Sequence, residues 1–307
     1  MIASVSLQLP YRIVLQVFQL HRAAARLNVF ATDPRREARM SGWIRRHRLV
    51  AFFVLSYAVA WAGWPFWAAG LLPEPLFLAC GPLVAALVVV GVAEGRRGYG
   101  ALLERMTRWR VGALWWVVAL TLPPAMVLAT ALLNTAAGAP AAAFGGLAWG
   151  ELALLFGLYL VNPLGGALGE EPGWRGYALP RLQADRTPLA AALVLGVLVA
   201  GWHLPLVVFG MLGAIGLLST AAITVVYVWL FNRGRGSALL ILVAHALQDA
   251  FTFGSLGYSA ADTARAEYLY CLVVVVVAAT LVVVDRAAWS GVTHEPPPAE
   301  VRAHGAG

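Results

Sequence analysis

Long stretches of apolar residues recur along the chain and are separated by short polar segments. A helix needs about 20 predominantly apolar residues to cross the hydrocarbon core of a bilayer. Stretches of this kind occur at residues 49–70, 75–93, 112–134, 148–168, 188–209, 213–232, 238–256 and 267–284. Prolines within them kink a membrane helix without excluding it. The pattern therefore predicts an all-α, polytopic integral membrane protein with about eight transmembrane helices.

The composition excludes most other classes of protein. Of the 307 residues, 61% are hydrophobic and only 12% are charged, whereas soluble domains carry about 25% charged residues. There is too little polar surface to cover a water-soluble enzyme of this size. A chain rich in Leu, Val, Ala and Trp is also not disordered. Cys80 and Cys271 both lie in apolar runs, which argues against a disulfide scaffold or a cysteine-rich metal site.

The basic residues predict the orientation of the chain in the membrane. The net charge is +7 and the strongly basic side chains are all arginines. With a cytoplasmic N-terminus, every arginine except Arg265 falls in the inner segments 1–48, 94–111, 169–187, 233–237 and 285–307. The positive-inside rule therefore favours an even number of spans with both termini in the cytoplasm. Because no nucleic-acid reader motif accompanies the charge, we expect the lipid bilayer, and no nucleic acid, as its partner.

The two ends of the chain are predicted to lie outside the transmembrane domain. Residues 1–44 are interpreted as a poorly ordered extension, and Met40, shortly before the first span, is hypothesised to be the natural start. Mass spectrometry of the mature N-terminus tests that hypothesis. Residues 45–286 form the predicted transmembrane domain, and the proline-rich segment 287–307 is predicted to be a disordered tail.

The inner segment 94–111 allows two interpretations. Leu102, Leu103, Met106 and Trp109 share one helical stripe, so the segment is either an amphipathic helix on the inner surface or an ordinary basic loop.

Ionisable residues in or beside membrane spans are energetically costly and by default indicate function. Glu170, Glu171 and Arg175 form one such cluster, in which Glu171 and Arg175 have the i, i+4 spacing of a helical ion pair. The pairing leaves Glu170 as the freer carboxylate, and a carboxylate in a dry site is suited to accept a proton from water. Pro172 predicts a break in the helix at this point. The alternative is a cytoplasmic loop whose charges are only solvated.

Two histidines lie inside predicted spans. His203 belongs to the fifth span, and His245 and Asp249 share one face of the seventh at i, i+4 spacing. A single histidine in an apolar span is more often a structural hydrogen-bonding group than a catalyst. Two histidines and two glutamates that converge on one cavity form a candidate hydrolytic site, in which a pair such as His245 and Asp249 can orient a ring nitrogen toward a developing oxyanion.

These three clusters together resemble the CPBP family of intramembrane glutamic endopeptidases, which includes the eukaryotic CAAX prenyl proteases and bacterial proteins linked to bacteriocin processing and self-immunity. The first family motif, two Glu, three residues and Arg, is similar to Glu170, Glu171 and Arg175. The second, Phe, three residues and His, has Val199 in place of Phe before His203. The third, His, three residues and Asn or Asp, is similar to His245 and Asp249. The resemblance covers about residues 45–285.

The resemblance implies a role for each residue. Glu170 with His203 would activate a water molecule for attack on a peptide carbonyl, and Glu171 with Arg175 would shape the site. His245 and Asp249 would stabilise the oxyanion. Because an ionised Asp cannot donate a hydrogen bond, we favour Asp249 as the residue that holds His245. The implied protein is a metal-independent protease without a cofactor that acts on a membrane-associated peptide or protein in the bacterial inner membrane.

Two other functions remain open at this point. A zinc protease could use His203, His245 and Glu170 as ligands, although the chain has no His-Glu-x-x-His pattern. A non-catalytic immunity factor or scaffold would keep the motifs only as a binding cavity. A transporter is a weaker alternative, because the sequence shows no inverted repeat.

Overall fold

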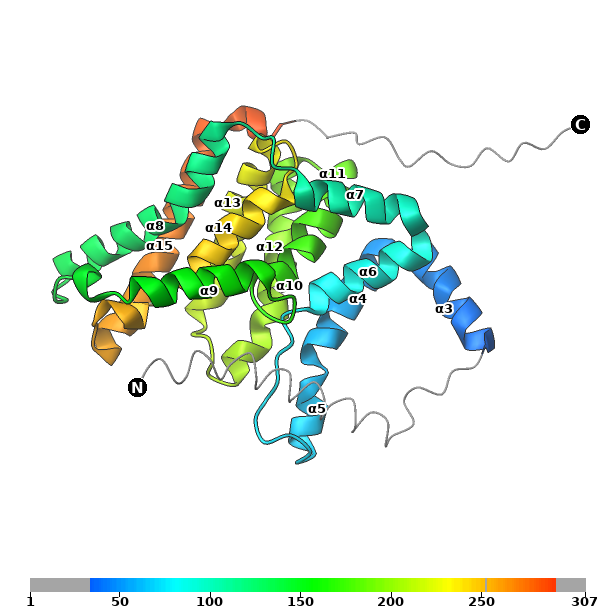
Figure 1. Ribbon diagram of the computed structural model, residues 1–307, viewed down its shortest axis with the longest axis horizontal. Helices are drawn as coiled ribbons and strands as arrows, with labels where there is room; N and C mark the ends of the chain where they lie inside the picture. Colours follow the sequence, from blue (N-terminus) through cyan, green and yellow to red (C-terminus); the bar gives the residue numbers. More distant parts are fainter. Residues whose placement is uncertain (1–33, 252, 291–307) are drawn as a thin grey trace, which may run out of the picture.

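The protein is described by a computed structural model that defines residues 34–251 and 253–290. Within these residues the secondary structure is entirely helical, which confirms the predicted all-α class. The α-helices are α3 (Pro34–Arg46), α4 (Arg48–Trp61), α5 (Gly63–Ala68), α6 (Gly81–Ala93), α7 (Gly95–Thr107), α8 (Ala113–Ala136), α9 (Trp149–Val161), α10 (Ala167–Glu171), α11 (Leu179–Ala184), α12 (Pro188–Val208), α13 (Ile215–Arg233), α14 (Ala238–Ala250) and α15 (Ala260–Val284). A π-helical segment, η2 (Pro172–Ala178), joins α10 to α11, and Figure 1 shows how these helices are arranged.

Five helical stretches are long and apolar enough to cross a membrane: Arg48–Ala68, Ala113–Ala136, Pro188–Val208, Ile215–Arg233 and Ala260–Val284. Three shorter apolar helices, α6, α9 and α14, occupy the positions of the other predicted spans. In Ala260–Val284 only 17% of the apolar window is buried inside the protein, so most of that surface faces outward, as lipid contact requires. The chain is therefore a multi-pass membrane protein, while eight spans and two cytoplasmic ends stay predictions.

The segment 169–187, which lies between two predicted spans, is helical over most of its length. Residues 167–184 form the continuous helix α10–η2–α11, and almost all of its side chains are buried. The preceding helix α9 ends at Val161, and the chain turns before α10 through Gly166, whose φ is 66°. The alternative of a cytoplasmic loop with solvated charges is therefore wrong, because Glu170, Glu171 and Arg175 are buried.

Helix α10–η2–α11 occupies the centre of the bundle. Helix α10 contacts α6, α9 and α14, η2 contacts α6, α7 and α14, and α11 contacts α12. In Figure 1 the ends of these neighbours converge on α10. The close approach to α6 depends on Gly173, because a Cβ at this position would lie 2.5 Å from the carbonyl oxygen of Pro82. Small residues at such crossings let membrane helices pack backbone to backbone.

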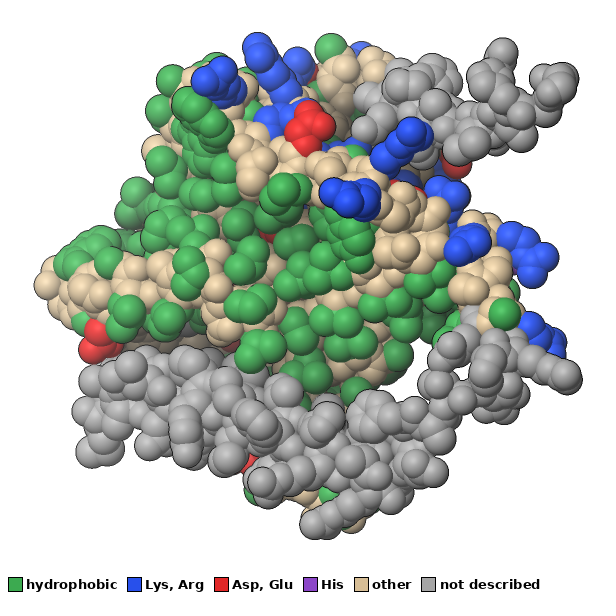
Figure 2. Space-filling view, turned by 45° about the vertical axis from the view of Figure 1, so that its right-hand side comes forward, with side chains coloured by type: hydrophobic (Ala, Val, Ile, Leu, Met, Phe, Trp, Pro, Cys, Tyr) green, Lys and Arg blue, Asp and Glu red, His purple; other side chains and the backbone are tan. Residues whose placement is uncertain are grey.

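Basic side chains are unevenly distributed over the surface of the protein. Figure 2 shows apolar side chains over much of the described surface, whereas arginines gather toward one end and one side of it. Arg265, the exception to the positive-inside pattern, donates hydrogen bonds to Asp262 (2.6 Å) and Asn134 (2.7 Å), so its charge is compensated locally.

The terminal extensions are only partly described. Helix α3 runs through Met40 without interruption and is followed by α4. The remainder of the predicted N-terminal extension and the tail from residue 291 lie outside the described residues. The boundaries 1–44, 45–286 and 287–307 therefore stay predictions.

Of the two interpretations of segment 94–111, the helix is the one that the structure shows, because α7 covers residues 95–107. Arg105 is buried (9% exposed), so it lies on the side of α7 that packs against the protein and not on its outer face.

Candidate active site

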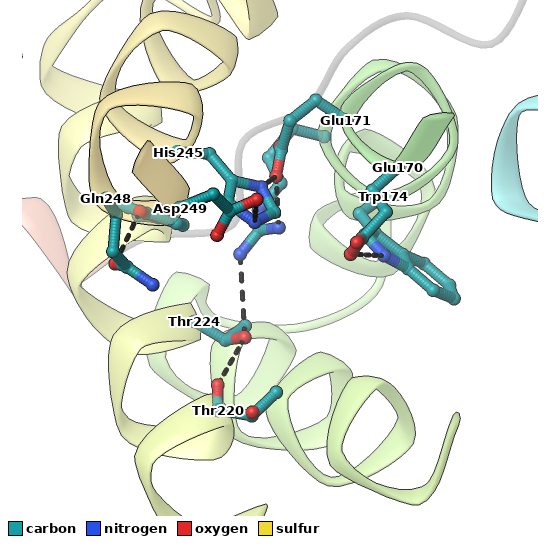
Figure 3. Close-up of polar contacts among 10 residues, drawn as sticks. Glu170, Glu171, Trp174, Thr220, Thr224, His245, Gln248 and Asp249 are labelled. Atoms are coloured by element: carbon teal, nitrogen blue, oxygen red, sulfur yellow. Dashed lines mark hydrogen bonds and ion pairs between the residues drawn. The ribbon is translucent and has the colours of Figure 1, made fainter. Parts of the chain in front are cut away.

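Four helical segments supply the six candidate residues. Glu170 and Glu171 end α10, Arg175 lies in η2, His203 lies in α12, and His245 and Asp249 lie in α14. Figure 3 shows the side chains of α10 and α14 facing one another across the centre of the bundle. The tertiary fold thus brings together residues that are up to 79 positions apart in the chain.

Glu171 is the centre of the polar network. Its side chain is 0% exposed, and Oε1 accepts a hydrogen bond from Nη1 of Arg175 at 2.9 Å. The same oxygen lies 2.7 Å from Nδ1 of His245. The predicted Glu171–Arg175 pair therefore forms, and the contact between Glu171 and His245 links the first family motif to the third.

Arg175 is held on its other side by α13. Its Nη2 lies 3.5 Å from the hydroxyl oxygen of Thr224, and its guanidinium carbon lies 5.1 Å from the centre of the Tyr227 ring. The side chain is 2% exposed. A guanidinium stays charged in proteins, so the Glu171 carboxylate and the Tyr227 ring compensate a full positive charge inside the bundle.

His245 lies between two carboxylates. Nδ1 faces Glu171, and Nε2 lies 3.4 Å from Oδ2 of Asp249. A ring that donates to both groups carries a hydrogen on each nitrogen. The geometry is consistent with the favoured interpretation that Asp249 holds His245, and Figure 3 shows the two side chains stacked along one face of α14.

Glu170 lies apart from this ion-paired group. It is 6% exposed, and its Oε2 accepts a hydrogen bond from the indole N–H of Trp174 at 3.3 Å. Among the described residues it forms no salt bridge, whereas Glu171 has two cationic or potentially cationic neighbours. The predicted difference between the two adjacent acids is therefore present in their contacts (Figure 3).

His203 is joined to the site through aromatic rings. Its Nδ1 lies 2.9 Å from the carbonyl oxygen of Val199 on the same helix. The ring of Trp202 lies 4.8 Å from that of His203 and 5.6 Å from that of Trp174, which bonds Glu170. No hydrogen bond joins His203 directly to Glu170 within the residues that the structure defines. The direct Glu170–His203 pairing implied by the resemblance therefore stays a prediction.

The family phenylalanine before His203 is Val199 in this chain, and an aromatic contact reaches His203 from elsewhere. Phe77, in the segment between α5 and α6, stacks on the imidazole with a centroid separation of 6.2 Å and an interplanar angle of 28°. Val199 has a smaller side chain than the phenylalanine of the family motif. The stacking of Phe77 provides a packing partner that sequence spacing could not reveal.

The α-helix ends at Glu171, and Pro172 begins the next helical segment, so the regular helix is interrupted at the predicted position. Because proline has no N–H to donate, the α-helical hydrogen bonds cannot continue unchanged, and the helix passes into the wider π-helical turn η2 instead. The Glu171–Arg175 pair is retained across this change. Short π-helical segments occur frequently at functional sites.

Four residues at the site were missed by the sequence analysis. Trp174 bonds Glu170, Thr224 and Tyr227 contact Arg175, and the hydroxyl of Tyr227 donates to Oε1 of Gln248 at 2.7 Å. Only Trp174 had a signal in the sequence, since it stands four residues after Glu170 on the same helical face. The others depend on the position of α13, which contacts Arg175 of η2 and Gln248 of α14.

The ligand set of the alternative zinc protease is not assembled. Across residues 34–251 and 253–290, no group of three or more His, Cys, Asp or Glu side chains is arranged to hold a metal ion. His203, His245 and Glu170, which that alternative requires, have separate partners.

The helical bundle is that of a multi-pass membrane protein with a buried polar site at its centre. Residues 152–251 match the family model described as type II CAAX prenyl endopeptidase Rce1-like. This match agrees with the family that the motifs resemble, and it covers all six candidate residues. A comparison with curated proteins found no match.

Proposed function

We propose that this protein is an intramembrane endopeptidase that hydrolyses a peptide bond of a membrane-associated peptide or protein with a water molecule activated by Glu170. The observation that carries the proposal is the contrast between two adjacent buried acids. Glu171 is engaged by Arg175 and His245, whereas Glu170 has only the Trp174 indole as a polar partner among the described residues. A carboxylate without a cationic partner is the better proton acceptor of the two.

In the proposed reaction, Glu170 takes a proton from water while the water oxygen attacks the carbonyl carbon of the substrate. When the proton of His203 is on Nδ1 and directed at Val199, Nε2 is free to accept the second hydrogen bond of that water. The proton on Glu170 then passes to the leaving amine as the C–N bond breaks, which returns the carboxylate to its first state.

Nε2 of His245 is the proposed donor to the oxyanion of the tetrahedral intermediate, because its 3.4 Å contact with Asp249 is long for a hydrogen bond and leaves this N–H available to a stronger acceptor. Glu171 and Asp249 flank its two nitrogens and orient the ring, and Arg175 balances the charge of Glu171. Donors fixed before the reaction stabilise developing charge without reorganisation. This mechanism uses side chains alone, without a metal or cofactor, and we place the protein in the bacterial inner membrane.

The proposal is tested by replacing the acid while keeping its shape. We expect Glu170→Gln to lower peptide-bond hydrolysis by about 100-fold or more, as loss of a general base does. Glu104→Gln, on the exposed face of α7, is the matched control and should retain activity. The readout is mass spectrometry of membrane-peptide termini in cells that carry each form, together with thermal unfolding of the purified full chain.

Cleavage that persists in a folded Glu170→Gln variant overturns the proposal. If no new termini depend on the wild-type protein while Glu170→Gln still supports its cellular role, the non-catalytic immunity or scaffold function is favoured instead.

A further inference from the structure

A cluster of exposed arginines lies on the side of the molecule formed by α3 and the first turn of α7. We call Arg45, Arg46, Arg96 and Arg97 the arginine patch, and all four side chains are exposed. Figure 2 shows basic side chains gathered on this side. The patch lies outside the candidate active site, and the proposed reaction does not use it.

Two contacts hold the separate parts of the patch together. Nε of Arg45 donates to the carbonyl oxygen of Val92, near the end of α6, at 3.1 Å. Arg48, at the start of α4, lies 3.8 Å from the carboxylate of Glu94, two residues before Arg96. The patch is therefore built from segments about 50 residues apart in the chain.

The positive charge of the patch is not neutralised by the nearby acid. Nη2 of Arg181 lies 2.6 Å from both carboxylate oxygens of Glu94, whose side chain is only 8% exposed. Within the described part of the chain, Arg46, Arg96 and Arg97 form no salt bridge. Exposed, uncompensated cations at this density create a positive local potential that attracts anionic partners.

The surroundings of the patch favour a lipid over a free anion. Trp43 and Tyr99 lie next to it and are each 40% exposed, as aromatic residues at a membrane interface are. Leu87 and Val88, on α6, are 40% and 41% exposed, and the hydroxyl of Tyr99 donates to the carbonyl oxygen of Leu87 at 2.8 Å. An apolar surface for acyl chains thus begins beside the cationic surface for a headgroup.

We propose that the arginine patch binds the headgroup of an anionic phospholipid, with the acyl chains lying along the exposed face of α6. The guanidinium groups match the phosphate oxygens in geometry and charge. An anionic phospholipid has a net negative headgroup, whereas a zwitterionic phospholipid has none. The arginine patch should therefore bind anionic phospholipids in preference to zwitterionic ones.

The test measures lipid binding and not proteolysis. The full chain, purified in detergent, is titrated with phosphatidylglycerol or phosphatidylcholine, and bound lipid is counted by native mass spectrometry. We expect the wild type to prefer phosphatidylglycerol, and Arg96→Gln/Arg97→Gln to weaken that binding by about fivefold for each arginine. Inorganic phosphate at the same concentration should not displace the lipid.

Arg186→Gln/Arg286→Gln removes two other exposed arginines and is the matched control. The proposal fails if the wild type binds both lipids equally, if the control loses as much binding as the patch variant, or if free phosphate displaces the lipid. Glu170→Gln should bind phosphatidylglycerol like the wild type, so failure of the proposed endopeptidase function leaves this result unaffected.

Discussion

The buried pair of Glu171 and Arg175 provides the sharpest prediction of stability. Glu171→Gln keeps the size of the side chain and removes its charge, leaving Arg175 at 2% exposure without a carboxylate partner. Arginine cannot release its proton to escape this environment. Removing one partner of a buried ion pair costs about 3–5 kcal/mol. The contacts of Arg175 with Thr224 and Tyr227 persist, so we expect a value near the lower end of that range.

The control is a Glu→Gln substitution in an exposed Glu–Arg ion pair with the same i, i+4 spacing. Glu104 and Arg108 are also i, i+4, but their side chains are 68% and 34% exposed. Glu104→Gln should cost about 0.5 kcal/mol or less. The measurement is unfolding of the full chain in mixed micelles with increasing sodium dodecyl sulfate. If the two variants lose the same stability, burial does not strengthen the Glu171–Arg175 interaction and the reasoning is refuted.

Two further predictions concern packing and pH. Gly173→Ala should destabilise the protein by about 1–3 kcal/mol, because the new Cβ meets the backbone of Pro82 at 2.5 Å. The control is Gly100→Ala on α7, which has open space around the new Cβ and should be neutral or stabilising. Equal thermal stabilities of the two variants would contradict this prediction. Asp285 follows the last membrane helix, and hydrogen bonds from Arg233 and Trp229 hold the pKa of its carboxyl below the usual 3.8. A lowered pKa in the folded state contributes stability above the unfolded pKa, and this contribution is lost as the pH falls through the folded value. Asp285→Asn should therefore be less stable than the wild type above about pH 4, with the difference shrinking in more acidic solution; a difference that does not change with pH contradicts the assignment.

The sequence alone determined the class of fold and the local pairs. Apolar runs of membrane-spanning length located the helices, because every backbone polar group in a bilayer must be satisfied within the helix. Helical spacing predicted the Glu171–Arg175 and His245–Asp249 contacts, since residues four apart lie on the same face.

Only the tertiary structure decided how these pairs join into one site. The contact of His245 with Glu171 spans 74 positions, and the stacking of Phe77 on His203 spans 126. Such contacts depend on where helices cross, which is set by small residues such as Gly173 rather than by local spacing. The hydropathy pattern did not reveal the buried helix at residues 167–184 for a related reason. It averages polarity along the chain, while burial of the acids depends on neighbours from α6 and α14 that cover them from other parts of the sequence.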